Sequence, residues 1–310
     1  MSFSSSIKQE LYSLKPKDLD SLTAEVYGLI LFSKNFSNDS FYFTSRNRKS
    51  IEILSNFLSE QLSITVDIST KLYHNRSSRE PNYTLSLLDK NDVNKIVSFF
   101  YKDADLKNIY INPANIKNDT QLKYFLKGVF LVCGSVINPQ KEYRLEFAIQ
   151  NISLANDLLK LLSNLPIELS PKVLVKKDKS SIYIKDNEQI FDFLAYIGAQ
   201  NSAMEFMQVK MVKEVRNYVN RTTNFQTANL SKTTSASLLQ IKAIQHIEEA
   251  KGKNFLTDDL KELALLRVQN PDMSLKELGE NLKVPLSRSG VNHRLKKIMY
   301  ISECIGKEKC

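Results

Sequence analysis

LKGVFLVCG, Leu126 to Gly134, is a mainly apolar run with a glycine, Gly128, at its third position. A similar run, VYGLILFSK, extends from Val26 to Lys34 and carries Gly28 at the same place, 100 residues earlier. A glycine in an apolar helix removes the side chain that would keep a second backbone away. The two runs therefore predict two buried helices that pack closely against each other.

Each run opens a similar series of predicted elements. Apolar periodicity indicates a helix, a strand, a helix, two strands and a helix in the first third of the chain, and the second third repeats this order. The first series covers 19–33, 40–44, 48–62, 64–68, 83–88 and 89–100, and the second covers 121–132, 143–149, 153–165, 169–175, 181–184 and 186–197. We therefore expect an α+β fold with two duplicated αβαββα halves, residues 1–105 and 106–200, followed by an all-α domain.

Composition favours a polyanionic partner. The chain has 310 residues, and its 43 basic against 34 acidic residues give a formal net charge of +9, which favours a polyanion through counterion release. We find no apolar run of the ~20 residues that a membrane-spanning helix needs, no apolar signal core and no strongly basic amphipathic anchor. These features predict a cytoplasmic protein without a membrane partner.

Cysteine and histidine are sparse and scattered. The three cysteines include no CxxC pair, and the three histidines lie far apart in sequence. Neither a disulfide framework nor a zinc site is indicated, so we expect no metal and no cofactor.

A connecting segment, residues 201–229, follows the repeat. It begins as a helix with a positive polar side and ends in a predicted turn rich in Asn and Thr, Thr222 to Asn229. Its polar residues could contact phosphates, but such residues also cap helices and tie domains together, and we favour the junction interpretation. The candidates are Arg216, Asn220, Arg221, Asn224, Asn229 and Lys232.

The C-terminal domain, residues 230–310, contains a second informative stretch, SLKELGENLKVPLSRSGVNHRLKKI, Ser274 to Ile298. Two helices are expected before it, Ser231 to Glu249 and Leu260 to Gln269. Within the stretch, Ser274 and Glu277 form a capping-box pattern at the start of a short apolar helix. Val284-Pro285-Leu286 interrupts that helix, and a second one begins at Ser287. The spacing predicts a helix-turn-helix over residues 274–298.

The second helix of this pair is basic, because no carboxylate occurs between Glu280 and Glu303. A helix held in this way can enter the major groove, where its early residues meet base edges and later cations meet phosphates. A plain helical hairpin with a solvated basic face is the alternative. The candidate DNA contacts are Arg288, Ser289, Asn292 and His293 near base edges, Arg294, Lys296 and Lys297 near phosphates, and Ser287, which can also cap the helix.

The glycine-containing run of Leu126 to Gly134 resembles the LAGLIDADG helix of homing endonucleases, whose paired helices join two halves of a saddle on DNA. In that family, the acidic residue next to last in the motif binds the catalytic divalent metal. Here Cys133 and Ser33 occupy that position, and neither supplies the carboxylate that a hard cation prefers. The resemblance, with this departure, implies a scaffold without catalytic residues, a protein that is not an enzyme.

The whole chain resembles the WhiA family of bacterial proteins. Three segments carry the resemblance, namely LKGVFLVCGSVINPQKEYRLEF, FDFLAYIGAQNSAMEFMQVKMVKEVRNYVNRTTNFQTANLSKT and PDMSLKELGENLKVPLSRSGVNHRLKKI. The family combines a degenerate LAGLIDADG scaffold with a C-terminal helix-turn-helix, and is associated with cell division, chromosome segregation and developmental transcription.

The resemblance implies a non-catalytic, nucleoid-associated protein that binds double-stranded DNA, but it does not decide among the roles of the family. We expect a protein of cell division and chromosome segregation that acts as a transcriptional regulator through its helix-turn-helix, with possible protein partners in division or transcription. Two alternatives stay open. One is an interaction scaffold without sequence-specific regulation, and the other is a metal-dependent endonuclease. The oligomeric state and the DNA target do not follow from the sequence.

Overall fold

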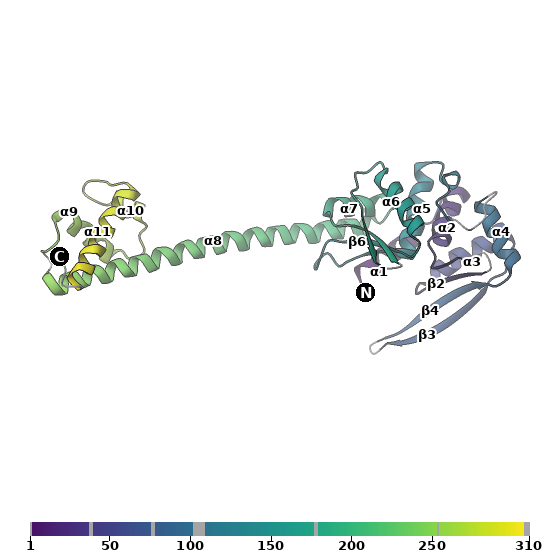
Figure 1. Ribbon diagram of the computed structural model, residues 1–310, viewed down its shortest axis with the longest axis horizontal. Coiled ribbons are helices and arrows are strands. Elements are labelled where there is room, and N and C mark those ends of the chain that lie inside the picture. Colours follow the sequence, from purple (N-terminus) through teal and green to yellow (C-terminus); the bar gives the residue numbers. More distant parts are fainter. Residues whose placement is uncertain are drawn as a thin grey trace. The chain divides into compact units, whose positions relative to one another are not determined.

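The computed structural model describes residues 2–36, 40–75, 78–101, 109–176, 179–252 and 254–306. The chain divides into two compact units, an N-terminal unit up to Glu214 and a C-terminal unit from Val215 onward (Figure 1). This division falls inside the segment predicted to connect the domains. The boundary predicted between the two halves, at residue 105, lies outside the described residues.

The first half of the N-terminal unit contains a four-stranded antiparallel sheet in the order β1-β2-β4-β3. A short helix, α1 (Phe3–Ser13), comes before it. The half itself consists of α2 (Leu19–Leu31), β1 (Asn35–Phe36), β2 (Phe41–Ser45), α3 (Arg48–Leu62), β3 (Asp67–Asn75), β4 (Ser78–Leu87) and α4 (Lys90–Phe100).

The second half repeats this arrangement with a sheet in the order β5-β6-β8-β7. A 3₁₀ turn, η1 (Pro113–Asn115), precedes it. The half consists of α5 (Asp119–Cys133), β5 (Gly134–Val136), β6 (Leu145–Ile149), α6 (Ile152–Ser163), β7 (Lys172–Lys176), β8 (Lys179–Ile184) and α7 (Asn187–Tyr196). The predicted duplicated α+β fold is confirmed.

One detail of the predicted repeat was wrong. Each half is αββαββα, because a short strand that the periodicity missed follows the first helix, β1 in one half and β5 in the other. β1 has only two residues, and β5 starts at Gly134, immediately after the last residue of α5. Such strands are too short to show the alternation from which a strand is predicted.

The helices α2 and α5 pack backbone to backbone at the two glycines. A Cβ atom on Gly28 would lie 2.4 Å from the carbonyl oxygen of Phe125, and one on Gly128 would lie 2.2 Å from that of Glu25. No real Cβ atom tolerates such contacts with backbone. The predicted close approach of the two apolar helices is therefore confirmed, and only glycine fits at both crossing positions.

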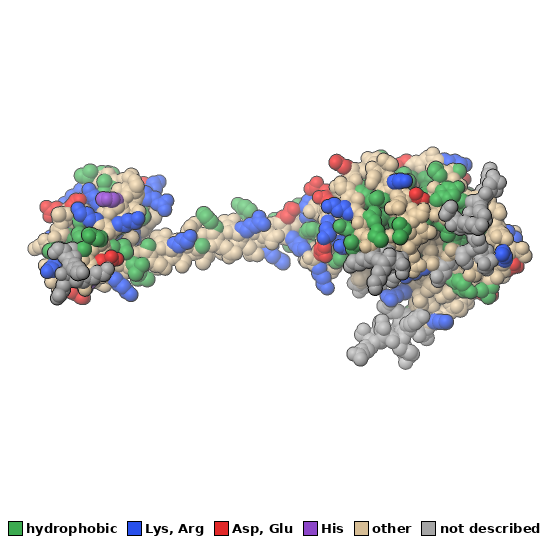
Figure 2. All heavy atoms as spheres, in the orientation of Figure 1, with side chains coloured by type: hydrophobic (Ala, Val, Ile, Leu, Met, Phe, Trp, Pro, Cys, Tyr) green, Lys and Arg blue, Asp and Glu red, His purple; other side chains and the backbone are tan. Residues whose placement is uncertain are grey.

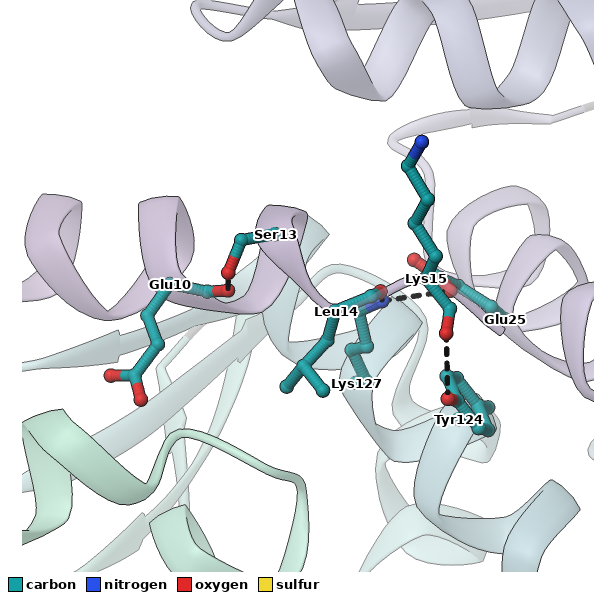
Figure 3. A network of polar contacts seen from close by, with 7 residues as sticks. All are labelled: Glu10, Ser13, Leu14, Lys15, Glu25, Tyr124 and Lys127. Carbon is teal, nitrogen blue, oxygen red and sulfur yellow. Dashed lines mark hydrogen bonds and ion pairs between the residues drawn. The ribbon is translucent and has the colours of Figure 1, made fainter. Parts of the chain in front are cut away.

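An ion pair is buried beside this crossing (Figure 3). Lys127 Nζ donates to Glu25 Oε2 at 2.9 Å and to the Leu14 carbonyl oxygen at 2.6 Å. Burial raises the pKa of the Glu25 carboxyl and lowers the pKa of the Lys127 ammonium, while the attraction between the two charges opposes both shifts. The positions that the repeat relates to this pair hold Phe125 and Tyr27, whose ring centroids lie 5.4 Å apart.

A single helix of 52 residues, α8 (Gln200–Lys251), follows α7. The turn predicted over Thr222 to Asn229 was therefore wrong, since those residues are helical. The start of α8 is capped by Glu10 of α1, whose carboxylate accepts from the backbone N–H groups of Asn201 and Ser202 at 2.7 and 2.8 Å. A carboxylate is favourable there because the first N–H groups of a helix lack partners within the helix.

The C-terminal unit has its own apolar core. It combines the end of α8 with α9 (Asp258–Gln269), α10 (Leu275–Glu280) and α11 (Arg288–Gly306), which lie together in Figure 1. Buried side chains from all four helices meet in it, including Ile244, Ile247, Leu260, Leu263, Leu278, Val291, Leu295 and Ile298.

Among the described residues, no helix is both long and apolar enough to span a membrane.

Candidate nucleic-acid interface

The predicted capping box opens α10. Ser274 N–H donates to Glu277 Oε2 at 2.7 Å, and Glu277 N–H donates to Ser274 Oγ at 3.3 Å. Backbone hydrogen bonding lowers the pKa of the Glu277 carboxyl, because the ionised form is the better acceptor. The reciprocal pair fixes the start of the helix that supports α11.

The turn between α10 and α11 closes on Gly279. Leu286 N–H donates to the Gly279 carbonyl oxygen at 3.0 Å, and a Cβ on Gly279 would lie 2.2 Å from the Leu286 carbonyl oxygen. Leu278 and Val291 are completely buried on the two sides of this turn. Two helices joined by a short turn and a shared apolar contact constitute a helix-turn-helix, as predicted over residues 274–298.

The first turn of α11 is ordered by Ser287. Its hydroxyl oxygen accepts from Gly290 N–H at 3.2 Å, and it lies 2.9 Å from Ser289 Oγ. This local network leaves Arg288 exposed at the beginning of the helix. The N-terminal end of α11, where base-reading residues of a recognition helix belong, is thus held in a defined geometry.

The predicted contact residues of α11 lie mainly on its outer surface. The exposed ones are Ser287, Arg288, Ser289, His293, Lys296 and Lys297, while Asn292 and Arg294 are half-buried. Arg288, Asn292 and Lys296 are four residues apart and therefore form one row along the helix. Arg288 can read guanine, Asn292 can read adenine, and Lys296 offers a cation to phosphate. This is the order expected for base contacts followed by phosphate contacts.

Arg294 differs from the other candidates because it already has a partner. Its Nε lies 3.6 Å from Asp259 Oδ2, and its Nη1 donates to the Asp259 carbonyl oxygen at 3.5 Å. These contacts join α11 to the first turn of α9. Arg294 thus has a structural contact in addition to any phosphate that it could reach.

The five candidates within the connecting segment, and Lys232 shortly after it, all lie exposed on α8. In the described part of the chain, their side chains make no hydrogen bond or ion pair to another element. Figure 2 shows Lys and Arg side chains along this helix with hydrophobic ones between them. Arg216, Asn220 and Asn224 share a face, while Val215 and Phe225, 64% and 69% exposed, lie on another. The exposure of these side chains therefore gives no support to the interpretation that they tie the domains together.

Ser33 and Cys133 lie together at the ends of the paired helices, lining one cavity of about 270 Å³. Burial raises the pKa of the Cys133 thiol to about 12, and Cys133 Sγ donates to the Val129 carbonyl oxygen at 3.3 Å. None of the described residues that line this cavity is a carboxylate. A neutral thiol and a serine hydroxyl are poor ligands for a hard divalent cation.

Sequence reasoning missed Arg267 of α9. Its side chain is 1% exposed and donates from Nη1 to the carbonyl oxygens of Pro271 and Met273 at 3.2 and 2.8 Å. These contacts hold the loop that leads into α10. Its spacing could have indicated that it is buried, because Arg267 falls on the apolar face of α9 with Leu260, Leu263 and Ala264.

The fold and the site together define a helix-turn-helix protein built on a LAGLIDADG-like scaffold. Family models agree, since residues 122–216 match the WhiA LAGLIDADG-like domain and residues 219–302 match the WhiA C-terminal HTH domain. The chain belongs to the WhiA family.

Similar proteins cover the chain almost end to end. One relative, named "Probable cell division protein WhiA", from Thermoanaerobacter sp. (strain X514), is 36% identical over 317 residues, 98% of each chain. A protein of the same name from Ruminiclostridium cellulolyticum is 38% identical over 314 residues, 99% of each chain. The crystal structure of full-length DUF199/WhiA from Thermatoga maritima matches with a TM-score of 0.57 and 26% identity, covering 98% of each chain.

Proposed function

We propose that the chain is a non-catalytic regulator that binds specific sites in double-stranded DNA through α11. The exposed row of Arg288, Asn292 and Lys296 at the start of a braced helix carries this proposal. Arginine and asparagine offer paired donors and acceptors that fit base edges in the major groove, and lysine pairs with phosphate. The net charge of +9 supports an anionic partner.

The N-terminal unit serves this regulator as a scaffold. Ser33 and Cys133 stand where a metal-binding nuclease needs carboxylates, and none of the described residues that line their cavity supplies a carboxylate for magnesium-dependent hydrolysis. Its role is to add phosphate contacts or to dock a protein partner. If purified protein with magnesium cleaved supercoiled plasmid, and a Cys133→Ala variant lost that cleavage, the non-catalytic assignment would fail.

The proposed cellular role is supported by the names of the relatives, which are called probable cell division proteins. The regulator acts on the nucleoid in the cytoplasm, and its bound sites affect division, chromosome segregation or both through transcription. A transcriptional route requires discrete binding sites, whereas a nucleoid scaffold requires none.

Crosslinking and sequencing of bound DNA across the genome separates these possibilities. Intact protein is compared with a form that ends before Ser274 and with an Arg288→Ala variant of the intact chain. We expect discrete peaks with a shared motif that disappear in the truncated form and weaken in the variant. Broad occupancy that is equal in all three samples would contradict sequence-specific binding by α11.

A further inference from the structure

A cavity of about 490 Å³ lies inside the C-terminal unit, beside the row of proposed base-reading residues. Every helix of the unit contributes to its wall. The lining residues are Lys232, Thr233, Ala236 and Gln240 of α8, Arg267 of α9, Ser274, Leu275 and Lys276 at the start of α10, and Arg288 and Asn292 of α11. The cavity is large enough for a phosphate group together with part of the molecule that carries it.

The charge of this cavity is one-sided. Four cations line it, Lys232, Arg267, Lys276 and Arg288, and none of the described lining residues is acidic. Two carboxylates lie next to lining residues: Glu280 Oε1 is 3.7 Å from Lys276 Nζ, and Glu277 Oε2 accepts from Ser274 N–H at 2.7 Å. Cations gathered on concave walls raise the local concentration of anions.

Arg267 lacks one of the hydrogen bonds that its burial demands. Nη1 donates to backbone carbonyl oxygens, but Nε, equally buried, has no partner in the described part of the chain. A guanidinium stays protonated under all ordinary conditions, and burial without a counterion is costly. The structure therefore holds a fixed positive charge with a donor that an incoming acceptor could use.

Gln240 provides a second unsatisfied group in the same wall. The side chain is 7% exposed, and its Oε1 is buried without a hydrogen-bond donor in the described residues. Buried polar atoms are normally paired, and an orphan commonly marks the place of a ligand or a water molecule. Arg267 Nε requires an acceptor and Gln240 Oε1 requires a donor, so the two orphaned groups indicate a polar occupant that offers both, as the oxygen and the P–OH of a monohydrogen phosphate do. The four cations of the wall favour an anionic one.

We propose that this cavity is a phosphate-binding site, in which Arg267 Nε donates to a phosphate oxygen and Lys232, Lys276 and Arg288 neutralise its charge. The proposal extends the proposed DNA-binding function, because Arg288 and Asn292 belong to both sites. The phosphate comes from one of two sources, the backbone of bound DNA or a free phosphorylated molecule. A free ligand would hold Arg288 and Asn292 and so modulate DNA binding.

Arg267 Nε–H gives a direct test, because it should have its own signal in a ¹H–¹⁵N correlation spectrum of the full chain. The signal is followed during titration with three probes in phosphate-free buffer, namely inorganic phosphate, adenosine monophosphate and a short duplex DNA. We expect a saturable shift of this signal with at least one of them, since a charge-assisted hydrogen bond replaces an unpartnered donor.

Lys232→Glu is the informative variant, and Lys242→Glu is its matched control. Both lysines are exposed on α8, but only Lys232 lines the cavity, so neither change should disturb folding. We expect Lys232→Glu to weaken binding of the effective probe about tenfold or more, because it removes a charge-assisted contact and adds repulsion. Lys242→Glu should change binding less than about twofold.

The probes distinguish the two sources. A shift with inorganic phosphate or the nucleotide identifies a free ligand, and a shift with duplex DNA alone identifies the DNA backbone. No shift with any probe, or a shift that Lys232→Glu leaves unchanged, would overturn the site.

Fluorescence anisotropy of labelled DNA is measured in parallel, so that the two proposals can fail separately. DNA binding without any Arg267 response refutes the cavity alone. A phosphate response without DNA binding refutes the proposed function alone.

Discussion

Glu25 and Lys127 form a buried ion pair, which makes the N-terminal unit sensitive to a change of either residue. Replacing Lys127 with Met leaves the Glu25 carboxylate buried and unpaired, and breaking such a pair costs about 3–5 kcal/mol of the free energy of unfolding. The double variant Glu25→Leu/Lys127→Met should recover most of the loss, because both charges are removed. Urea unfolding of the three proteins, followed by circular dichroism, measures the difference.

The loss in Lys127→Met should also depend on pH. Burial already raises the pKa of Glu25, and removing the cation beside it raises it further. A carboxyl whose pKa is higher in the folded than in the unfolded chain contributes stability at low pH that is lost as pH rises through the folded pKa. The deficit relative to wild type should therefore shrink on acidification from pH 8 to about pH 5. A deficit independent of pH would argue against a buried charge as its cause.

Arg288 offers the sharpest residue-scale test of DNA reading. Arg288→Ala should weaken binding to the selected site by about 1–3 kcal/mol and relax the preference at one base position, because a bidentate contact to guanine is lost. Lys242→Ala, which removes an exposed cation from α8, is a suitable control because Lys242 is not among the candidate DNA contacts. Affinity is measured by anisotropy on the selected site and on a scrambled duplex. Unchanged discrimination in Arg288→Ala would remove this residue from the base-reading set.

Residue types predicted some of the site chemistry but not its contacts. The replacement of the acidic residues by Ser33 and Cys133 was visible from the sequence, because comparing one motif position with the family pattern is enough to detect a missing carboxylate. The roles of Lys127 and Arg267 were not, because each depends on which distant backbone carbonyls and side chains the fold brings near. A charged residue on an apolar helical face, as at both positions, was the only local sign.

At the scale of elements, the sequence predicted where most helices lie but not the continuity of α8. Asn and Thr between residues 222 and 229 favour turns and caps, and they suggested a break. Yet the segment from Gln200 to Lys251 contains no Gly or Pro, and α8 ends only before Gly252, which has a φ of +85°. Weak preferences of several polar residues do not stop a helix that lacks a true breaker.

Two glycines near the turn of the helix-turn-helix provide a matched pair for testing that element. Gly279→Ala should destabilise the C-terminal unit by about 1–3 kcal/mol or more, because its Cβ would press on the Leu286 backbone. Gly290→Ala meets only ordinary contacts, at 3.6 Å or beyond, and should stabilise α11 by about 0.5–1 kcal/mol. Amide exchange in α9 and α11 measures both effects. Equal effects of the two substitutions would contradict the closure of the turn on Gly279.

For the whole molecule, the salt dependence of DNA binding counts the phosphate contacts. The logarithm of the association constant falls with that of salt concentration by about 0.9 for each contact with duplex DNA. Lys296→Ala/Lys297→Ala should therefore flatten this slope by about 2. Lys242→Ala/Lys251→Ala removes the same charge away from α11. If both double variants flattened the slope equally, net charge and not contact by α11 would be responsible.

The crossing of α2 and α5 has a further consequence for how the two halves recognise each other. The repeat relates the pair of Glu25 and Lys127 to the pair of Phe125 and Tyr27. The same contact therefore occurs twice across the crossing, once as an ion pair and once as a pair of aromatic rings. Two first halves associated symmetrically would each bury an unpaired Glu25, and two second halves would each bury an unpaired Lys127. We therefore expect each half to associate with the other in preference to a second copy of itself, because self-association would leave a buried charge without its partner.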